Sequence, residues 1–236
     1  MSNFLHELGY SPLAYWLPAA GLLVLLMASV VAPFRPSRWT RWCRNSPVVF
    51  GGLLLLTMIA WRWPAVLHYK TVNPDEPQFL AGAITLLSNG RFWWGDPTTS
   101  GPLVVLPLAL PGLFGLPVNY ETGRIVALLL EWGVVFLAYL TMRHTHGDPR
   151  ARLQILPLAA LMVFLLFWDF VPYCSELSPL FLCALATWLG VTAFSSEGQV
   201  RSRGRLGTAG LVLGLLPFSK FQVLPLGAAI GLSLTI

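Results

Sequence analysis

Long apolar stretches recur along the 236-residue chain and constrain its fold more than any other feature of the sequence. A helix that crosses a lipid bilayer needs about 20 mostly apolar residues. The stretches that meet this requirement are Pro12–Val31, Pro47–Leu67, Thr122–Met142, Leu153–Val171, Leu177–Phe194 and Leu206–Ile236. We therefore predict an all-α fold, a polytopic transmembrane helical bundle.

The composition excludes the main alternatives. Hydrophobic residues make up 56% of the chain and charged residues only 11%, whereas a soluble domain carries roughly 25% charged residues. An aromatic fraction of 13% and a net charge of +5 also exclude disorder. The pI of 9.4 reflects basic residues spread through apolar sequence, so we expect membrane lipids around the protein and no nucleic-acid partner. Cys43, Cys174 and Cys183 form neither a disulfide framework nor a metal-binding spacing.

The first apolar stretch stands apart from the others. We assign residues 1–46 to an extra N-terminal span with a basic loop, and residues 47–236 to the core of the bundle. Because Ile236 lies inside an apolar run, we expect this core to be the N-terminal part of a larger protein, or a truncated product.

The orientation follows from the positive-inside rule, which places basic loops in the cytoplasm. Residues 70–101 and 172–176 then lie outside, and an even number of spans must separate the first two basic loops. The proline-rich segment 102–116 would break this parity, so we predict that it lies along or dips into the outer face, as part of an embedded outer loop with short surface helices. The basic loops are marked by Arg35, Arg38, Arg41 and Arg44, by Arg143, Arg150 and Arg152, and by Arg201, Arg203 and Arg205.

The outer loop contains an acidic pair at a predicted helix start. Asn73 or Asp75 can cap a helix over residues 76–88, and the pair Asn89-Gly90 is a stop signal. The positive end of this helix favours the ionised forms of Asp75 and Glu76. Two interpretations remain open: the acids form a helix cap with a dipole charge, or a carboxylate beside an apolar cavity acts as a general base or holds a cation.

Further motifs follow this pair in a defined order. They are Gly101-Pro102-Leu103, Leu113-Phe114-Gly115, Arg124 at the start of a span, Tyr173-Cys174-Ser175-Glu176, and the glycine-rich segment from Gly214 to Lys220. Over residues 47–236, this order resembles the GT-C superfamily of membrane glycosyltransferases, which includes the protein O-mannosyltransferase (glycosyltransferase family 39) and aminoarabinose transferase branches. The chain departs from many relatives at Thr99-Ser100-Gly101-Pro102, where they have a Lys or His before two prolines.

The resemblance implies a function. Such enzymes transfer a sugar, with inversion, from a polyprenyl-phosphate donor at the extracytoplasmic face. Asp75 would be the catalytic base, Glu76 a second catalytic carboxylate, and Glu176 would orient substrate. A divalent cation held by the two carboxylates is possible but not required. We therefore expect a glycosyltransferase of the bacterial inner membrane with an outward-facing site, and leave its acceptor open.

Charged residues inside or beside the apolar stretches are further candidates, because burying a charge in a bilayer is costly. Arg124 would either anchor its span at the interface or clamp a phosphate bidentately. Lys220 lies in a proline-broken helix, which favours phosphate binding over pairing with a buried acid such as Glu131. Lys70 would anchor the interface or supply the cation that Ser100 does not.

Two more charges have structural interpretations. Arg62 lies between Trp61 and Trp63, which favours an anchor in the aromatic belt of the membrane. Glu131 lies in the middle of a predicted span, and we expect it to be a paired structural charge.

Two other functions remain open. A transporter or flippase of lipid-linked sugars would show inverted repeats, and the sequence contains no second copy of the Asp75-Glu76 loop. In a non-catalytic membrane scaffold, the outer acids would have no role, and replacing Asp75 with Asn would change nothing.

Overall fold

A computed structural model describes residues 12–34, 46–68, 73–89, 100–164, 171–194 and 199–234. Within these ranges the chain is helical, and its only β-type contact is an isolated bridge between Phe194 and Val200. The predicted all-α class is confirmed.

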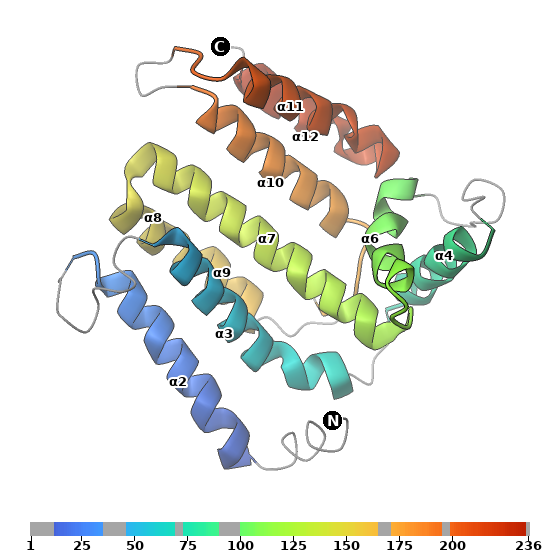
Figure 1. Ribbon diagram of the computed structural model, residues 1–236, viewed down its shortest axis with the longest axis horizontal. Coiled ribbons are helices and arrows are strands. Elements are labelled where there is room, and N and C mark those ends of the chain that lie inside the picture. Colours follow the sequence, from blue (N-terminus) through green and yellow to red (C-terminus); the bar gives the residue numbers. More distant parts are fainter. Residues whose placement is uncertain are drawn as a thin grey trace.

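The first half of the bundle contains the longest helices. Helices α2 (Pro12–Val31) and α3 (Pro47–His68) pack side by side, and α7 (Tyr120–His146) packs against α3 (Figure 1). The short helices α8 (Asp148–Gln154) and α9 (Leu156–Phe164) follow, and the break between them lies near the start of the span predicted over Leu153–Val171. Pro157, at the second position of α9, cannot donate an amide to the preceding turn, so the helix breaks there.

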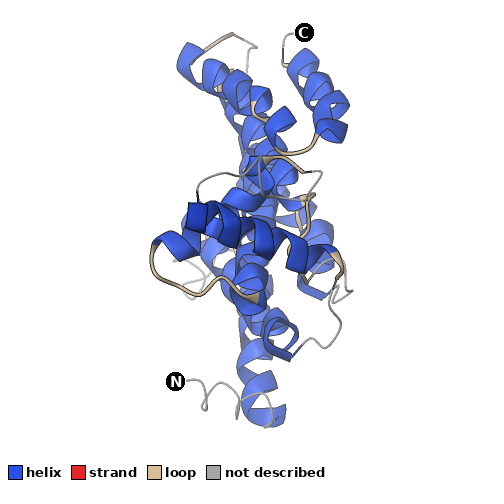
Figure 2. Cartoon of the chain, turned by 90° about the vertical axis from the view of Figure 1, so that its right-hand side faces the viewer, coloured by secondary structure: helices blue, strands red, loops and turns tan. Residues whose placement is uncertain are grey.

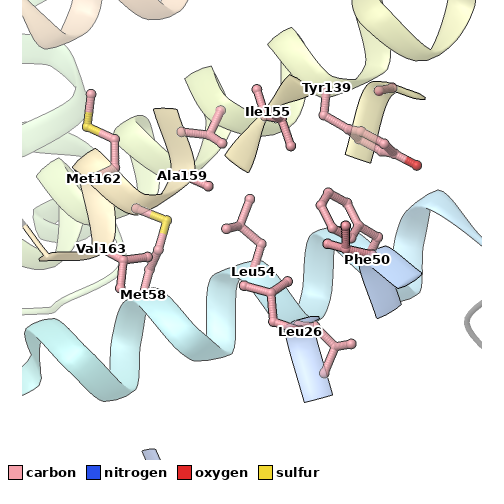
Figure 3. Packing of buried hydrophobic residues seen from close by; sticks show 13 residues of the cluster. Leu26, Phe50, Leu54, Met58, Tyr139, Ile155, Ala159, Met162 and Val163 are labelled. Carbon is pink, nitrogen blue, oxygen red and sulfur yellow. The ribbon is translucent and has the colours of Figure 1, made fainter. Parts of the chain in front are cut away.

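Apolar side chains from these helices form the main hydrophobic core (Figure 3). Leu54 and Met58 of α3 face Ile155 and Ala159, and the rings of Phe50 and Tyr139 pack with their centroids 4.6 Å apart. Burial of such side chains is the dominant favourable term in folding.

The second half of the bundle contains α10 (Leu177–Thr192) and a broken helical hairpin. Helix α11 (Arg203–Gly214) returns along α10 and is followed by two 3₁₀ turns, η1 (Leu216–Phe218) and η2 (Phe221–Val223), and by α12 (Leu224–Ser233). This break was predicted from the prolines around Lys220. It brings backbone that is not α-helical to the start of α10.

Two helices lie beside the bundle. Helix α4 (Asp75–Asn89) extends one residue beyond the predicted helix at each end, and packs on α6 (Pro102–Leu113). Both lie near the start of α7 (Figure 1), and Figure 2 shows them in front of the long helices. Helix α6 has 12 residues and is about 18 Å long. It is therefore too short to span a bilayer, as the parity argument predicted.

The two ends of the bundle differ in charge. Helices α3 and α7 run antiparallel, so that the end of α3 lies by the start of α7, where Arg124 donates to the carbonyl of Val66. The candidate acids Asp75, Glu76 and Glu176 lie at this end, which we name the acidic end. The described arginines of the second and third basic loops lie at the other, which we name the basic end: there His144, late in α7, contacts the carbonyl of Phe194, just after α10.

Two helices are long and apolar enough to cross a membrane, covering Pro47–Leu67 and Tyr120–His146. Shorter apolar helices cover Tyr15–Val31, Pro102–Leu113, Leu177–Thr192 and Phe221–Ser233. Of the further span predicted over Leu153–Val171, the structure describes helix α9 as far as Phe164, and residues 165–170 lie outside the described part of the chain.

The interpretation of Arg62 as an interface anchor is wrong. Its side chain is 1% exposed and forms a salt bridge with Glu131 of α7, which is equally buried. Each charge stabilises the other away from water, and this compensates for part of the cost of burial. The prediction that Glu131 is a paired structural charge is therefore confirmed.

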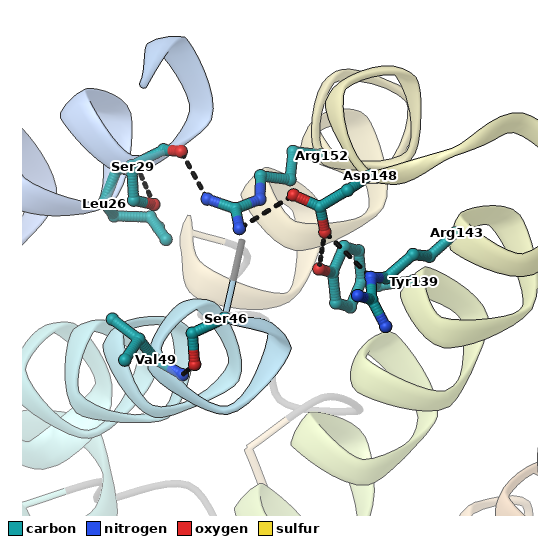
Figure 4. A network of polar contacts seen from close by, with 8 residues as sticks. All are labelled: Leu26, Ser29, Ser46, Val49, Tyr139, Arg143, Asp148 and Arg152. Atoms are coloured by element: carbon teal, nitrogen blue, oxygen red, sulfur yellow. Dashed lines mark hydrogen bonds and ion pairs between the residues drawn. The ribbon is translucent and has the colours of Figure 1, made fainter. Parts of the chain in front are cut away.

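Arg152, one of the arginines that mark the second basic loop, lies in α8 and forms contacts with other helices. It is fully buried, donating to the carbonyl of Ser29 at 2.6 Å and to Asp148 at 2.8 Å (Figure 4). The other carboxylate oxygen of Asp148 accepts from Arg143 at 3.0 Å and from the hydroxyl of Tyr139. This network joins α8 to α2 and α7.

Candidate active site

The start of α4 separates the two adjacent acids. The side chain of Asn73 accepts a hydrogen bond from the backbone N–H of Asp75 at 2.9 Å, which satisfies one of the free amides at the helix start. Successive helical residues are rotated by about 100°. Consequently Asp75 is exposed, whereas Glu76 is completely buried.

Glu76 forms a bidentate ion pair with Arg124. The Nε and one terminal nitrogen of Arg124 donate to the two carboxylate oxygens at 3.0 and 3.2 Å, and its other terminal nitrogen donates to the carbonyl of Val66 at 3.3 Å. Burial raises the pKa of Glu76, while the hydrogen bonds and charge of Arg124 oppose this shift. The pair thereby fastens α4 to the start of α7 and the end of α3.

A cavity of about 250 Å³ opens beside Asp75. It is lined by side chains from α4, from the start of α6, from the turn before α10 and from the break between α11 and α12. These are Asp75, Gln78, Phe79, Ser100, Ser175, Lys220, Phe221 and Gln222. Among the described residues, Asp75 is the only carboxylate in this lining and Lys220 the only cation. The cavity therefore combines a proton acceptor with a group that can hold an anion.

Lys220 is held at the cavity by the motif Tyr173-Cys174-Ser175-Glu176. Its Nζ donates to the hydroxyl of Ser175 at 2.8 Å and to a carboxylate oxygen of Glu176. Burial raises the pKa of Glu176, but hydrogen bonds from Lys220 and Ser175 outweigh that effect, so the pKa lies below its usual range. Lys220 pairs with Glu176, and the alternative of a pair with Glu131 is wrong.

Gly101 allows the start of α6 to approach this break closely. Its backbone N–H donates to the carbonyl of Ser219 at 2.8 Å. A Cβ atom at position 101 would lie 2.0 Å from the carbonyl oxygen of Phe218, so that only glycine fits. A second contact fixes α6 from the other side, where the hydroxyl of Tyr173 donates to the carbonyl of Val104 at 2.5 Å.

The predicted site residues are thus only partly assembled. Asp75 and Lys220 share the cavity, and Glu176 contacts Lys220, but Glu76 and Arg124 neutralise each other in the core. Because both oxygens of Glu76 bind Arg124, the two acids are not arranged to share a divalent cation. Within the described ranges no cluster of three or more His, Cys, Asp or Glu side chains could hold a metal ion. Lys70 lies outside the described residues.

The polar lining of the cavity was not predicted from the sequence. Gln78 lies three residues after Asp75, a spacing that places both on one helix face, and this signal was available. Gln222 lies two residues after Lys220 in the short 3₁₀ turn η2, and no periodicity in the sequence predicts its direction.

No protein family, curated protein or solved structure matches this chain in comparisons of sequence and fold. Any functional conclusion therefore rests on the geometry of the cavity and on the order of motifs.

Proposed function

We propose that the protein is a membrane glycosyltransferase that moves a sugar from a polyprenyl-phosphate donor to an acceptor at the extracytoplasmic face. The observation that carries this proposal is the cavity that places an exposed carboxylate, Asp75, and a cation, Lys220, together from distant parts of the chain. The resemblance of the motif order to GT-C enzymes supports the same function.

Exposed apolar side chains support a place in the membrane. Leu13, Leu17 and Val24 of α2 are between 66% and 74% exposed, and Leu211 and Leu232 of the broken hairpin are 73% and 64% exposed. Exposure of such side chains to water is unfavourable, whereas a lipid environment stabilises them. We propose that the bundle spans the bilayer, with the acidic end outside as the positive-inside rule requires.

Lys220 suits the donor phosphate better than Arg124 does. Arg124 is 5% exposed and held by a buried carboxylate, and removing such a partner costs about 3–5 kcal/mol. The side chain of Glu176, by contrast, is 63% exposed, and exposed ion pairs contribute only about 0–1 kcal/mol. A phosphate can therefore replace Glu176 at Lys220 at little cost.

The chemistry assigned to the cavity is an inverting displacement. The carboxylate of Asp75 takes the proton of an acceptor hydroxyl, whose oxygen forms a bond to the anomeric carbon of the sugar. The bond between that carbon and the phosphate oxygen breaks, and its electron pair remains on the phosphate. Lys220 stabilises the negative charge that develops there.

Transfer assays in membranes test this proposal. The intact chain and an Asp75→Asn variant are supplied with a panel of radiolabelled polyprenyl-phosphate sugars, and labelled product is counted. Losing a general base lowers the rate roughly 10²- to 10⁴-fold. Glu121→Gln, which removes an exposed acid outside the cavity lining, is the matched control and should keep the parent rate. Equal transfer by the parent and Asp75→Asn would exclude Asp75 as the base.

Cysteine labelling tests the membrane arrangement separately. Two single-cysteine variants are made from a parent without native cysteines. Ser88→Cys places a thiol at an exposed position of α4 near the acidic end, and Arg150→Cys places one at an exposed position of α8 near the basic end. An impermeant thiol reagent added to intact cells should label Cys at position 88 and not at position 150. Labelling of both positions from outside would contradict a bundle that spans the membrane.

A further inference from the structure

A second polar cavity lies at the basic end, away from the proposed active site. It has a volume of about 410 Å³ and lies where α7, α8 and α10 meet. Its lining combines cationic, polar and apolar side chains: Leu140, Arg143, His144, Asp148, Trp188 and Thr192. Helix α7 has 27 residues and is about 40 Å long. This separates the cavity from Arg124 and from the chemistry proposed at the opposite end.

The charge around this cavity is positive. Of the residues that the structure describes, Asp148 is the only carboxylate in its lining, and that carboxylate is shared between Arg143 and Arg152. Two guanidinium groups on one carboxylate leave one positive charge. Arg205 adds another at the edge, where its terminal nitrogen donates to the carbonyl of Thr192 at 3.2 Å.

Arg143 can bind an additional anion. Only its Nε donates to Asp148, at 3.0 Å, and its side chain is 39% exposed. Within the described part of the chain, neither terminal nitrogen has a hydrogen-bond partner. Cations in the last turn of a helix also balance the helix dipole, but that role does not use these two donors. A planar pair of N–H groups fits two oxygens of one phosphate.

The remaining walls suit a lipid. Leu140 and Trp188 add apolar surface beside the cations, and Trp is enriched where membrane proteins meet headgroups. Basic pockets between helices at the cytoplasmic side bind anionic headgroups. Exposed Arg150, Arg201 and Arg203 lie at the same end of the bundle and would attract an anionic leaflet.

We propose that this cavity binds the phosphate group of an anionic phospholipid, with Arg143 as the bidentate donor and Trp188 against the glycerol backbone. A free phosphate ion shares the recognised chemistry but lacks the glycerol backbone that would contact Trp188. The inference depends on the membrane location and is independent of sugar transfer, so its failure and that of the proposed function can be told apart.

Thermal unfolding of the full chain in neutral detergent tests this inference. Dioctanoyl phosphatidylglycerol, dioctanoyl phosphatidylcholine and inorganic phosphate are titrated in parallel, and apparent dissociation constants follow from the stabilisation. We expect phosphatidylglycerol to bind at least ten times more tightly than either of the other two. Equal binding of phosphatidylcholine would overturn the proposal, and equal binding of inorganic phosphate would overturn the assignment to a lipid.

Two substitutions assign the binding to the cavity. Arg143→Gln should weaken phosphatidylglycerol binding roughly tenfold or more, as expected for loss of charge-assisted hydrogen bonds. Arg150→Gln removes the same charge at an exposed position outside the cavity lining and should change binding less than twofold. Equal weakening by both would indicate diffuse attraction and overturn the site.

The Arg143→Gln variant loses the contact with Asp148 and could fail to fold for that reason. A second variant, Arg143→Lys, avoids this problem. Lysine keeps the charge and can still pair with Asp148, but it cannot present two parallel donors. We expect this variant to fold and to bind phosphatidylglycerol at least threefold more weakly than the parent. Unchanged binding would exclude bidentate recognition by Arg143.

Discussion

The adjacent acids Asp75 and Glu76 should respond to substitution in opposite ways. Glu76→Gln removes the charge that compensates Arg124, which is 5% exposed in the core. Breaking a buried ion pair costs about 3–5 kcal/mol. Glutamine can still accept one hydrogen bond from Arg124, so we expect about 3 kcal/mol. Asp75→Asn changes an exposed side chain, and should alter the free energy of unfolding by no more than about 0.5 kcal/mol.

Thermal unfolding of the purified chain in detergent, followed by circular dichroism, measures this difference. On the scale of domains with 150–250 residues, about 3 kcal/mol corresponds to a decrease in Tm of roughly 6–12 °C. Glu76→Gln should show this decrease, and Asp75→Asn should unfold at the parent temperature while losing sugar transfer. A Glu76→Gln variant with the parent Tm would refute the buried pair.

A double-mutant cycle checks that the loss comes from Arg124. Arg124→Gln alone leaves Glu76 buried without its partner, whereas the double variant leaves no buried charge. The double variant should therefore lose at least 1 kcal/mol less, in rough terms, than the sum of the single losses. Additive losses would show that the two side chains do not interact.

Substitutions at two glycines, at the buried pair of Arg62 and Glu131, and at Glu176 should also change the stability of the protein. Gly101→Ala should lower the Tm and impair transfer because a Cβ would meet backbone at 2.0 Å, whereas Gly210→Ala, with nothing within 4 Å, should raise stability by up to about 1 kcal/mol. Glu131→Gln should cost about 3–5 kcal/mol, and replacing Arg62 and Glu131 together by Met and Leu should restore most of it in the same unfolding assay. The lowered pKa of Glu176 means that its stabilising contribution is complete above the ordinary value of 4.5 and is lost as the pH falls below it; a Glu176→Gln variant should lack this acid-dependent loss in a Tm profile from pH 6 to 3.

The sequence predicted the helices well where local signals agree. Helix α4 starts at the Asn73 cap and ends at Asn89, beside the stop signal, and the prolines near Lys220 break the last apolar stretch as expected. These features depend on chemistry within a few residues, since caps and prolines act on the neighbouring turn. The span predicted from Leu153 begins three residues later, at Leu156, because hydropathy does not detect the break at Pro157.

The partners of the charges could not be predicted in the same way. Arg62 and Glu131 are far apart in the sequence, and their meeting depends on how α3 packs on α7. The orientation of Glu76 had a local signal, because it shares helical spacing with Phe79, Leu80 and Ala83, which form the buried face of α4. The apolar residues of α4 therefore already indicated the position of Glu76, and only Asp75 remained for the cavity.

Three helix starts contribute to the charge of the proposed active site. Helix α4 begins at Asp75, whereas α6 and α10 begin two residues after Ser100 and Ser175, and all three residues line the cavity. Each helix start carries about half a positive charge. Together with Lys220 they offset the negative charges of Asp75 and Glu176, so that the site can accept an anionic donor despite its two carboxylates.

This balance leads to a prediction that separates donor binding from turnover. Asp75→Asn removes a negative charge from the cavity and leaves Lys220 and the three helix starts in place. The variant should bind a polyprenyl-phosphate sugar about fivefold or more tightly than the parent, because a nearby like charge repels the phosphate, while it transfers sugar roughly 10²- to 10⁴-fold more slowly. Binding is measured with radiolabelled donor in detergent, with Glu121→Gln as the control that keeps the parent affinity. Weaker binding by Asp75→Asn would mean that Asp75 holds the donor by accepting hydrogen bonds from the hydroxyl groups of the sugar. The assignment of Asp75 as the base would then be wrong.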